Sequence, residues 1–294
     1  MLLTLWVVFT ISFPLMRMVQ GDPFVAEKVM SPEVKQAKRE RYGYNLPLTQ
    51  QYFHRLKMMI FHADLGESPK LYVPVSQLIV EGFPVSASLG VLALSFAIVL
   101  GIGAGIVSAV DRYSVWDVLA MSAATLGIAV PNFVLASVAI LLFVFYVPIF
   151  PAGGWGSVRQ LVLPAICLGA PFAAYIARLT RTGMLEVLNQ DYIRTAHAKG
   201  LSQAHVVLRH ALRGALLPVV SYLGPAIAGV LTGSLVLEKI FFIPGMGSHF
   251  IEAATQRDYE VALAMVLVYT FLLFAANTLV DLAYVILDPR VKLQ

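Results

Sequence analysis

The sequence predicts an all-α integral membrane protein with about six transmembrane helices. Hydrophobic residues make up 59% of the 294 residues, charged residues make up only 13%, and the mean hydropathy is +0.77. This apolar share exceeds that of ordinary soluble domains. The apolar residues also gather in runs of about 20 residues or more, which is enough to cross a bilayer as a helix.

The first predicted element covers residues 1–19, which are apolar and carry Arg17 near their end. A signal peptide begins with basic residues and ends at a small-residue cleavage site, and neither is evident before Gly21. We therefore expect an uncleaved first transmembrane helix with a very short cytoplasmic lead.

Residues 21–81 differ in composition, because acids and bases are mixed here with aromatic residues. This stretch is the one place where a small water-exposed subdomain is expected. Within it we predict a helix from Pro32 to about Arg41. Ser31 suits the N-cap of this helix, and Gly43 suits its stop.

Five further apolar segments are long enough to span the membrane. They are residues 84–110, 115–147, 161–179, 214–237 and 261–287.

Glycine and proline give some of these spans specific features. Gly101, Gly103 and Gly105 lie inside an apolar span, where small residues let helix backbones approach closely. Pro131 interrupts the span 115–147 and is expected to kink it. For the neighbouring Asn132 two interpretations stay open: it lines a pore, or it packs between helices.

A basic island between two spans sets the orientation. It contains Arg178, Arg181, Arg194, Lys199, Arg209 and Arg213. Lys and Arg clustered beside spans mark the cytoplasmic side. Alternation then places both termini in the cytoplasm and residues 21–81 outside.

The island also predicts a short helix from Asp191, a stop at Gly200 and a second helix that leads into the membrane. The residues assigned to this knob are Tyr192, Ile193, Arg194, Thr195, Ala196, Lys199, Gly200 and Leu201. Tyr192, Ile193 and Ala196 form one apolar stripe at helical spacing. Two interpretations stay open at this point. The stripe could seat in the cleft of a cytosolic partner, with the small Ala196 allowing close contact, or it could rest on the membrane surface.

Several classes of function are disfavoured. The six histidines are scattered without metal-ligand spacing, and Cys167 is the only cysteine, so we expect no catalytic site, disulfide or metal site. No G-x-x-x-x-G-K-[ST] motif occurs, so ATP-driven transport would need its ATPase on another polypeptide. The net charge is +4, and the basic residues lie in loops beside the spans. The orientation of the spans in the membrane accounts for their position there, so nucleic acid is not expected as a partner.

The motifs themselves point to a family. DYIRTAHAKGL at residues 191–201, with LRHAL at 208–212 and ALLPV at 215–219, resembles the EAA loop of ABC importer permeases in the form used by the peptide-transport branch. PAGGW at 151–155 and the terminal DPR at 288–290 extend the resemblance, which covers nearly the whole chain in order. Within that branch, the chain resembles most the first permease subunit of the oligopeptide importers. Arg-Thr-Ala replaces the Glu-Ala-Ala that opens the general loop pattern, and the spacing from Gly200 to Pro218 is longer.

The resemblance implies a type I ABC importer permease fold and a translocation subunit, not an enzyme, for oligopeptides in the bacterial cytoplasmic (inner) membrane. It implies three kinds of partner besides membrane lipid: a second homologous permease subunit, two cytosolic ATP-binding subunits that hold ATP and Mg, and an extracytoplasmic peptide-binding protein. No cofactor is expected on this chain.

The expected domains are residues 1–81, with the first helix and the outer subdomain, a permease core at 82–284 and a cytoplasmic tail at 285–294. Asn132, Ser221 and Pro225 are the candidates for lining the translocation path. A permease for dipeptides, nickel chelates or another small solute is the alternative within this class. A secondary transporter or an integral scaffold is the alternative outside it, although neither paired repeats nor midplane ionisable groups are evident.

Overall fold

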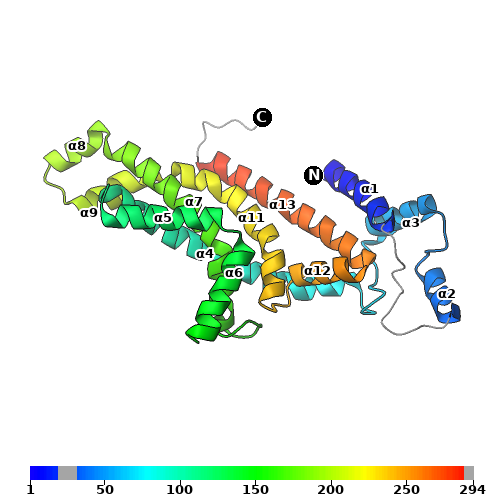
Figure 1. Ribbon diagram of the computed structural model, residues 1–294. Coiled ribbons are helices and arrows are strands. Elements are labelled where there is room, and N and C mark those ends of the chain that lie inside the picture. Colours follow the sequence, from blue (N-terminus) through cyan, green and yellow to red (C-terminus); the bar gives the residue numbers. More distant parts are fainter. Residues whose placement is uncertain (19–31, 288–294) are drawn as a thin grey trace. The chain divides into compact units, whose positions relative to one another are not determined.

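The computed structural model describes residues 1–18 and 32–287, and within these ranges the chain is built from helices, with one isolated β-bridge between Glu67 and Pro74. Figure 1 shows the order of the helices. The chain divides into two compact units. The first joins Met1–Ser86 to Ile243–Phe274, and the second joins Ala87–Phe242 to the chain from Ala275 onward. The division at residue 81 expected from the sequence stays a prediction.

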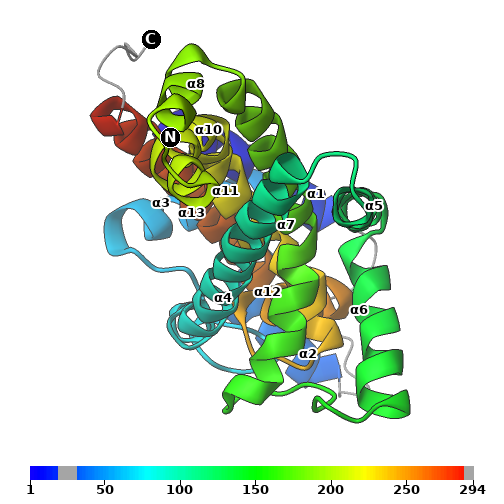
Figure 2. The same cartoon turned by 90° about the vertical axis from the view of Figure 1, so that its left-hand side faces the viewer.

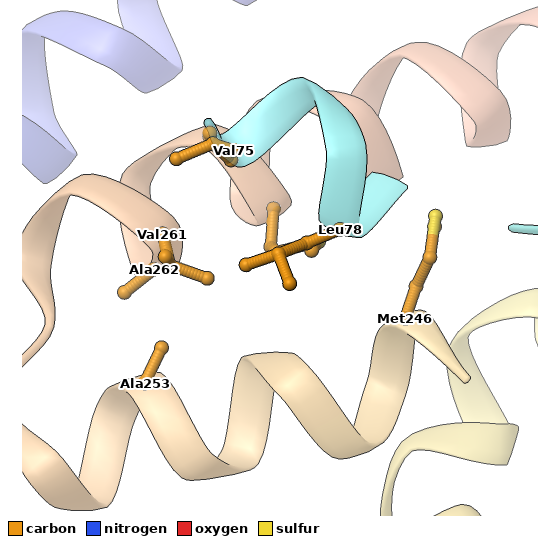
Figure 3. Packing of buried hydrophobic residues seen from close by; sticks show 8 residues of the cluster. Val75, Leu78, Met246, Ala253, Val261 and Ala262 are labelled. Carbon is orange, nitrogen blue, oxygen red and sulfur yellow. The ribbon is translucent and has the colours of Figure 1, made fainter. Parts of the chain in front are cut away.

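The first unit contains α1 (Leu2–Met18), α2 (Pro32–Arg41), α3 (Leu48–His62), the start of α4 (Val75–Val110), α12 (Met246–Gln256) and the start of α13 (Tyr259–Leu287). One of its cores lies where the start of α4 meets α12 and α13. Val75 and Leu78 of α4 face Met246 of α12 and Val261 of α13 (Figure 3). This packing joins the two chain segments that make up the first unit, Met1–Ser86 and Ile243–Phe274.

Helix α2 has the bounds that the sequence predicts. Gly43 follows it with φ of +67°, which is the left-handed conformation expected of a glycine stop. The predicted N-cap, Ser31, lies outside the described residues.

Helix α3 packs one face against α1, and the water-exposed subdomain expected of residues 21–81 stays a prediction. Its side chains Tyr52, Leu56 and Met59 pack against a core that contains Phe9 and Phe13 of α1. A hydroxyl–hydroxyl hydrogen bond of 2.8 Å also joins Tyr52 to Thr10 of α1. The mixed composition of α3 thus gives it one apolar face that packs on α1, while most of its other residues stay exposed.

The second unit contains the rest of α4, α5 (Val115–Ala129), α6 (Asn132–Ile140), the π-helix η1 (Leu141–Tyr146), α7 (Val158–Leu188), α8 (Asp191–Ala198), α9 (Gln203–His205), the π-helix η2 (Val206–Ala211), α10 (Leu212–Ala215) and α11 (Leu217–Ile240). Each predicted span falls on a helix or on a bent pair of helices. Among the described residues, α4, α7 and α13 are long and apolar enough to span a membrane alone, and two bent pairs raise the number of candidate spans to as many as five. Helix α1, with 17 residues, is shorter than these.

The kink predicted at Pro131 is a full break of the span. Pro131 has extended backbone angles (φ −56°, ψ 139°), and the helices before and after it meet at 110°. Figure 2 shows α6 turning away from the end of α5. A second bend of 55° separates the segment Gln203–Ala215 from α11.

Close packing of α4 on α7 confirms the role predicted for two of the three small residues. A Cβ added at Gly101 would lie 2.7 Å from the carbonyl oxygen of Ala173, and one at Gly105 would lie 2.6 Å from that of Ala177. Gly103 faces open space instead. The two glycines four residues apart therefore form the face of α4 that meets α7.

Candidate coupling loop and the ion pair beside it

The candidate coupling loop follows the end of α7. Helix α8 begins at Asp191 and ends at Ala198, and Gly200 follows with φ of +78°. The predicted glycine stop is therefore confirmed, because only glycine adopts this conformation without steric cost. The chain then returns through α9, η2 and α10, and α8 and α9 lie together beyond the end of α7 (Figure 1).

The apolar stripe of α8 faces its own chain. Ile193 is 1% exposed and Ala196 is 7% exposed, and both belong to a buried cluster with Val206 and Ala211 of η2. The expectation that this stripe seats in a partner's cleft is therefore wrong for these two residues. A stripe at helical spacing shows that a helix has a buried face, but it does not show which partner covers that face.

The same cluster fixes the loop to the helices that carry it. It includes Ala109 of α4 and Met184 of α7, both buried. Helices α7 and α10 approach so closely that a Cβ on Gly183 would overlap the carbonyl oxygen of Ala215. Leu201 packs on the edge of this cluster. Because protein interiors are densely packed, the loop and the ends of α4 and α7 form one stiff body.

The remaining knob residues form the exposed surface of the loop. Tyr192, Arg194, Thr195, Lys199 and Gly200 are all exposed. The Arg194 side chain is 76% exposed, and its 3.8 Å pair with Asp191 is loose and solvated, so it contributes little to stability. The surface that a partner could touch is thus polar and basic with one aromatic ring, not an apolar stripe.

A buried ion pair connects α5 to α7 close to the loop. Arg181 of α7 donates two parallel hydrogen bonds of 2.9 Å, from Nε and Nη2, to the two carboxylate oxygens of Asp117. Asp117 is buried in the first turn of α5. A bidentate guanidinium–carboxylate contact fixes both orientation and distance, so it ties the two helices rigidly together.

Neighbouring groups complete the coordination of the carboxylate. The hydroxyl of Ser108, on α4, donates to Asp117 Oδ1 and accepts from Arg181 Nε at 2.9 Å. The amide of Tyr113 donates to Oδ2 at 2.9 Å. Three helices, α4, α5 and α7, therefore meet at one polar joint.

Sequence reasoning missed this joint. It counted Arg181 as one member of the basic island and assigned no role to Asp117. The available indication was a single carboxylate in the otherwise apolar run 115–147, since a lone charge near a span needs a partner.

The three residues predicted to line the path occupy two helices of the second unit. Asn132 is the first residue of α6, directly after the break, and is half-buried. Ser221 and Pro225 are exposed one turn apart on α11, where the Ser221 hydroxyl donates to the carbonyl of Leu217 at 3.0 Å. A cavity of about 210 Å³ in this unit is lined instead by small residues of α4, α5 and α7. The lining role of the three residues stays a prediction.

Comparison with known families identifies the class of protein. The family described as "Binding-protein-dependent transport system inner membrane component" matches residues 101–293. The chain therefore belongs to this family of multi-pass permeases.

Individual relatives match over nearly the whole chain. An oligopeptide transport system permease protein of Haemophilus influenzae, OppB, is 44% identical over 98% of this chain and 95% of its own length. The OppB of Escherichia coli K12 is 40% identical over the same shares. A dipeptide transport system permease protein of Bacillus subtilis, DppB, is 45% identical over 99% of this chain and 94% of its own length.

Solved structures confirm the predicted fold class. A chain of the MetNI methionine ABC transporter in an inward-facing conformation covers 70% of this chain and 96% of its own length, with a TM-score of 0.54 and 17% identity. A chain of an amino acid ABC transporter crystallised with histidines gives a TM-score of 0.57 at 16% identity, over 70% of this chain and 92% of its own. The all-α fold is that of type I ABC importer permeases.

Proposed function

We propose that this chain is the transmembrane permease subunit of an ATP-driven, binding-protein-dependent importer that moves oligopeptides across the bacterial cytoplasmic membrane. The observation that carries the proposal is the similarity, over 98% of the chain, to permeases named for oligopeptide transport. In this proposal both termini are cytoplasmic. The chain performs no hydrolysis itself, because ATP and Mg are held by two cytosolic partner subunits.

Dipeptides are the second candidate substrate. The relative named for dipeptide transport is 45% identical, and the first of the oligopeptide relatives is 44% identical. Identity at this level does not separate the two substrates, so peptide length must be measured directly.

The coupling loop would act as a rigid lever. Ile193 and Ala196 hold α8 on its own chain, so the exposed Tyr192, Arg194, Thr195 and Lys199 are left to contact the ATPases. A push on α8 would move the ends of α4 and α7 with it, since one cluster joins all three. The Arg181–Asp117 pair would then carry the movement to α5, the helix that ends at the Pro131 break.

The translocation path would lie on the exposed face of α11. Ser221 and Pro225 share this face, and a polar hydroxyl on a membrane helix is better placed toward a wet path than toward lipid. A second permease subunit opposite this face would enclose the path, with Asn132 at the break of the neighbouring span. An outer binding protein would deliver the peptide to it.

The substrate is tested by reconstitution. The purified complex in vesicles should show ATP hydrolysis stimulated by a binding protein loaded with oligopeptides. Stimulation by dipeptide-loaded protein alone would favour the second candidate. ATP-independent uptake by this chain without partner subunits would overturn the importer assignment in favour of a secondary transporter.

The lever is tested by charge reversal on the exposed side of α8. Arg194→Glu combined with Lys199→Glu should lower ATP-driven uptake about tenfold or more, because like charges at an interface disfavour the correct partner. Arg112→Glu, at an exposed position between α4 and α5, is the matched control and should stay within about twofold of the parent. Unchanged uptake in the double variant would contradict the lever. Ala196→Asp would not test docking, because the carboxylate would enter the chain's own core.

A further inference from the structure

The first unit contains a charged cavity that the transport mechanism does not use. The cavity has a volume of about 390 Å³. Arg17 of α1, Arg55 of α3 and Glu260 of α13 lie in its wall. These are the three helices that also pack together through Phe9, Tyr52 and Leu263.

Counted over the described residues, the buried charges of this cavity do not balance. Arg17 and Arg55 each place a guanidinium nitrogen 2.9 Å from a different oxygen of the one Glu260 carboxylate. The three side chains are only 10%, 14% and 9% exposed. Two cations thus share one anion in a place that water reaches poorly, where an uncompensated charge is unfavourable.

Both arginines also keep unused donors. Among the residues that the structure describes, the buried atoms Arg17 Nη1 and Arg55 Nε have no hydrogen-bond partner, and neither does Glu260 Oε2, which meets Arg55 only as an ion pair. Arg55 Nη2 donates to the carbonyl of Leu65, and the Arg17 guanidinium lies 3.9 Å from the centre of the Tyr44 ring. The spare positive charge and the two spare N–H groups together fit a singly charged oxyanion.

The mouth of the cavity has a different character. Glu67 pairs there with Arg41 at 2.9 Å, and Glu40 accepts from Gln36 at 3.1 Å. Arg41 neutralises Glu67, so Glu40 leaves one negative charge at the mouth, which favours a ligand whose phosphate enters first and whose amine stays outside.

A separate apolar groove of about 550 Å³ lies on the same three helices. Its wall includes Leu5, Phe9, Leu56, Met59, Leu267 and Phe271. Arg17 and Phe9 are eight residues apart on α1, which is about 12 Å of helix. One leaflet of the hydrocarbon core is about 15 Å thick, so a lipid chain can follow this distance. Ile60, also in the groove wall, is exposed, and so are Phe53 and Phe61 on the same helix α3.

We propose that α1, α3 and α13 form a specific phospholipid site. The headgroup phosphate takes the free donors of Arg17 and Arg55, and one acyl chain lies in the groove below. In the predicted topology this lipid belongs to the outer leaflet. It joins α3 to the membrane helices at the point where two arginines share the single carboxylate of Glu260 among the described residues.

The test is a lipid titration of the full chain, purified in detergent within its transporter complex. Native mass spectrometry counts bound dioleoyl phosphatidylethanolamine, which has the phosphate, the amine and the acyl chains. Dioleoylglycerol, which has the same chains without phosphate, should bind about tenfold more weakly, because hydrogen bonds to the charged phosphate are absent.

Two variants examine the two halves of the site separately. Arg17→Lys keeps a positive charge beside Glu260 but removes the spare nitrogen, and should weaken lipid binding about tenfold without unfolding the protein. Val268→Trp fills the groove and should also weaken binding. Val80→Trp makes the same change at an exposed position of this unit outside the groove and should leave binding unchanged.

Three outcomes would overturn the proposal. Equal binding of dioleoylglycerol and phosphatidylethanolamine would indicate lipid held by apolar contact only. Saturable binding of inorganic phosphate or of dialanine that competes with no lipid would indicate a site for a free anion. Binding unaffected by both Arg17→Lys and Val268→Trp would place the lipid elsewhere.

Discussion

The two buried ion-pair clusters of this molecule use the same chemistry in different ways. In the second unit, Arg181 and Asp117 meet with both carboxylate oxygens occupied, and Ser108 and the Tyr113 amide complete the coordination. In the first unit, Arg17 and Arg55 share Glu260 and keep N–H donors that no other described residue accepts. A closed cluster fixes helices to each other, whereas an open one retains the capacity to bind a further anion.

The closed cluster should show the largest effect on stability. Arg181→Met leaves the Asp117 carboxylate buried without its cation, and should lower the free energy of unfolding by about 3–5 kcal/mol. Replacing both partners, as Arg181→Met with Asp117→Leu, should recover much of this loss because no isolated charge remains. Denaturant unfolding of the purified protein in detergent measures both. A double variant no more stable than Arg181→Met alone would contradict a specific pair.

Breaking the open cluster should have a smaller effect. Arg55→Met leaves Glu260 paired with Arg17 at 2.9 Å, so no carboxylate is stranded. We expect a loss of about 1.5–3 kcal/mol, the range for hydrogen bonds to charged groups. The same unfolding assay tests it. A loss as large as that of Arg181→Met would mean that Glu260 needs both arginines for its neutralisation. The two clusters would then not differ in the way described.

Packing around the loop can be examined with two glycines. Gly183→Val places side-chain atoms against the backbone of Ala215 and should cost about 1–3 kcal/mol by overpacking. Gly103→Val is the matched control, because a Cβ there meets no atom within 4 Å. The difference between their unfolding midpoints isolates the contact of α7 with α10. Equal midpoints would show that the loop is not fixed to α7 as described.

A third buried carboxylate extends the comparison to pH. Asp258 accepts hydrogen bonds from the Ser68 hydroxyl and the Val261 amide, yet burial raises its pKa above the ordinary 3.8. Because the folded state then holds the proton more tightly, this contribution to stability is complete below pH 3.8 and is lost as the pH rises through the raised pKa.

Asp258→Asn should remove that dependence, so the parent should lose more thermal stability than the variant between about pH 4 and pH 7. This is the smallest effect expected, since one group is involved. Asp64→Asn, at an exposed position, is the control and should follow the parent. A parent and Asp258→Asn with parallel pH profiles would contradict the role of burial.

The sequence predicted elements whose causes are local. Helix α2 follows from proline and glycine at its ends, and the spans follow from the length of their apolar runs. The break at Pro131 was expected as a kink, although its size of 110° depends on tertiary packing. Helices α3 and α12 were not expected, because both lie in stretches whose mixed composition is typical of loops.

The sequence predicted where the coupling loop lies in the chain, but not which contacts bury the apolar face of α8. Gly200 identified the end of α8 correctly. The stripe of Ile193 and Ala196 was visible, but its partner was the chain's own η2, α4 and α7, and no local pattern indicates such a contact. The Arg181–Asp117 pair joins residues 64 positions apart, so composition and spacing did not connect them.

The burial of one face of α8 against its own chain limits how chimaeric transporters can be made. A transplant limited to residues 191–201 would bring Ile193 and Ala196 into a foreign core shaped for other side chains. The smallest exchangeable module also includes their contacts, residues 106–110 of α4, 183–188 of α7 and 206–215. Exchange of coupling loops between importers is therefore limited first by how the loop packs within its own permease, and only then by its contact with the ATPase.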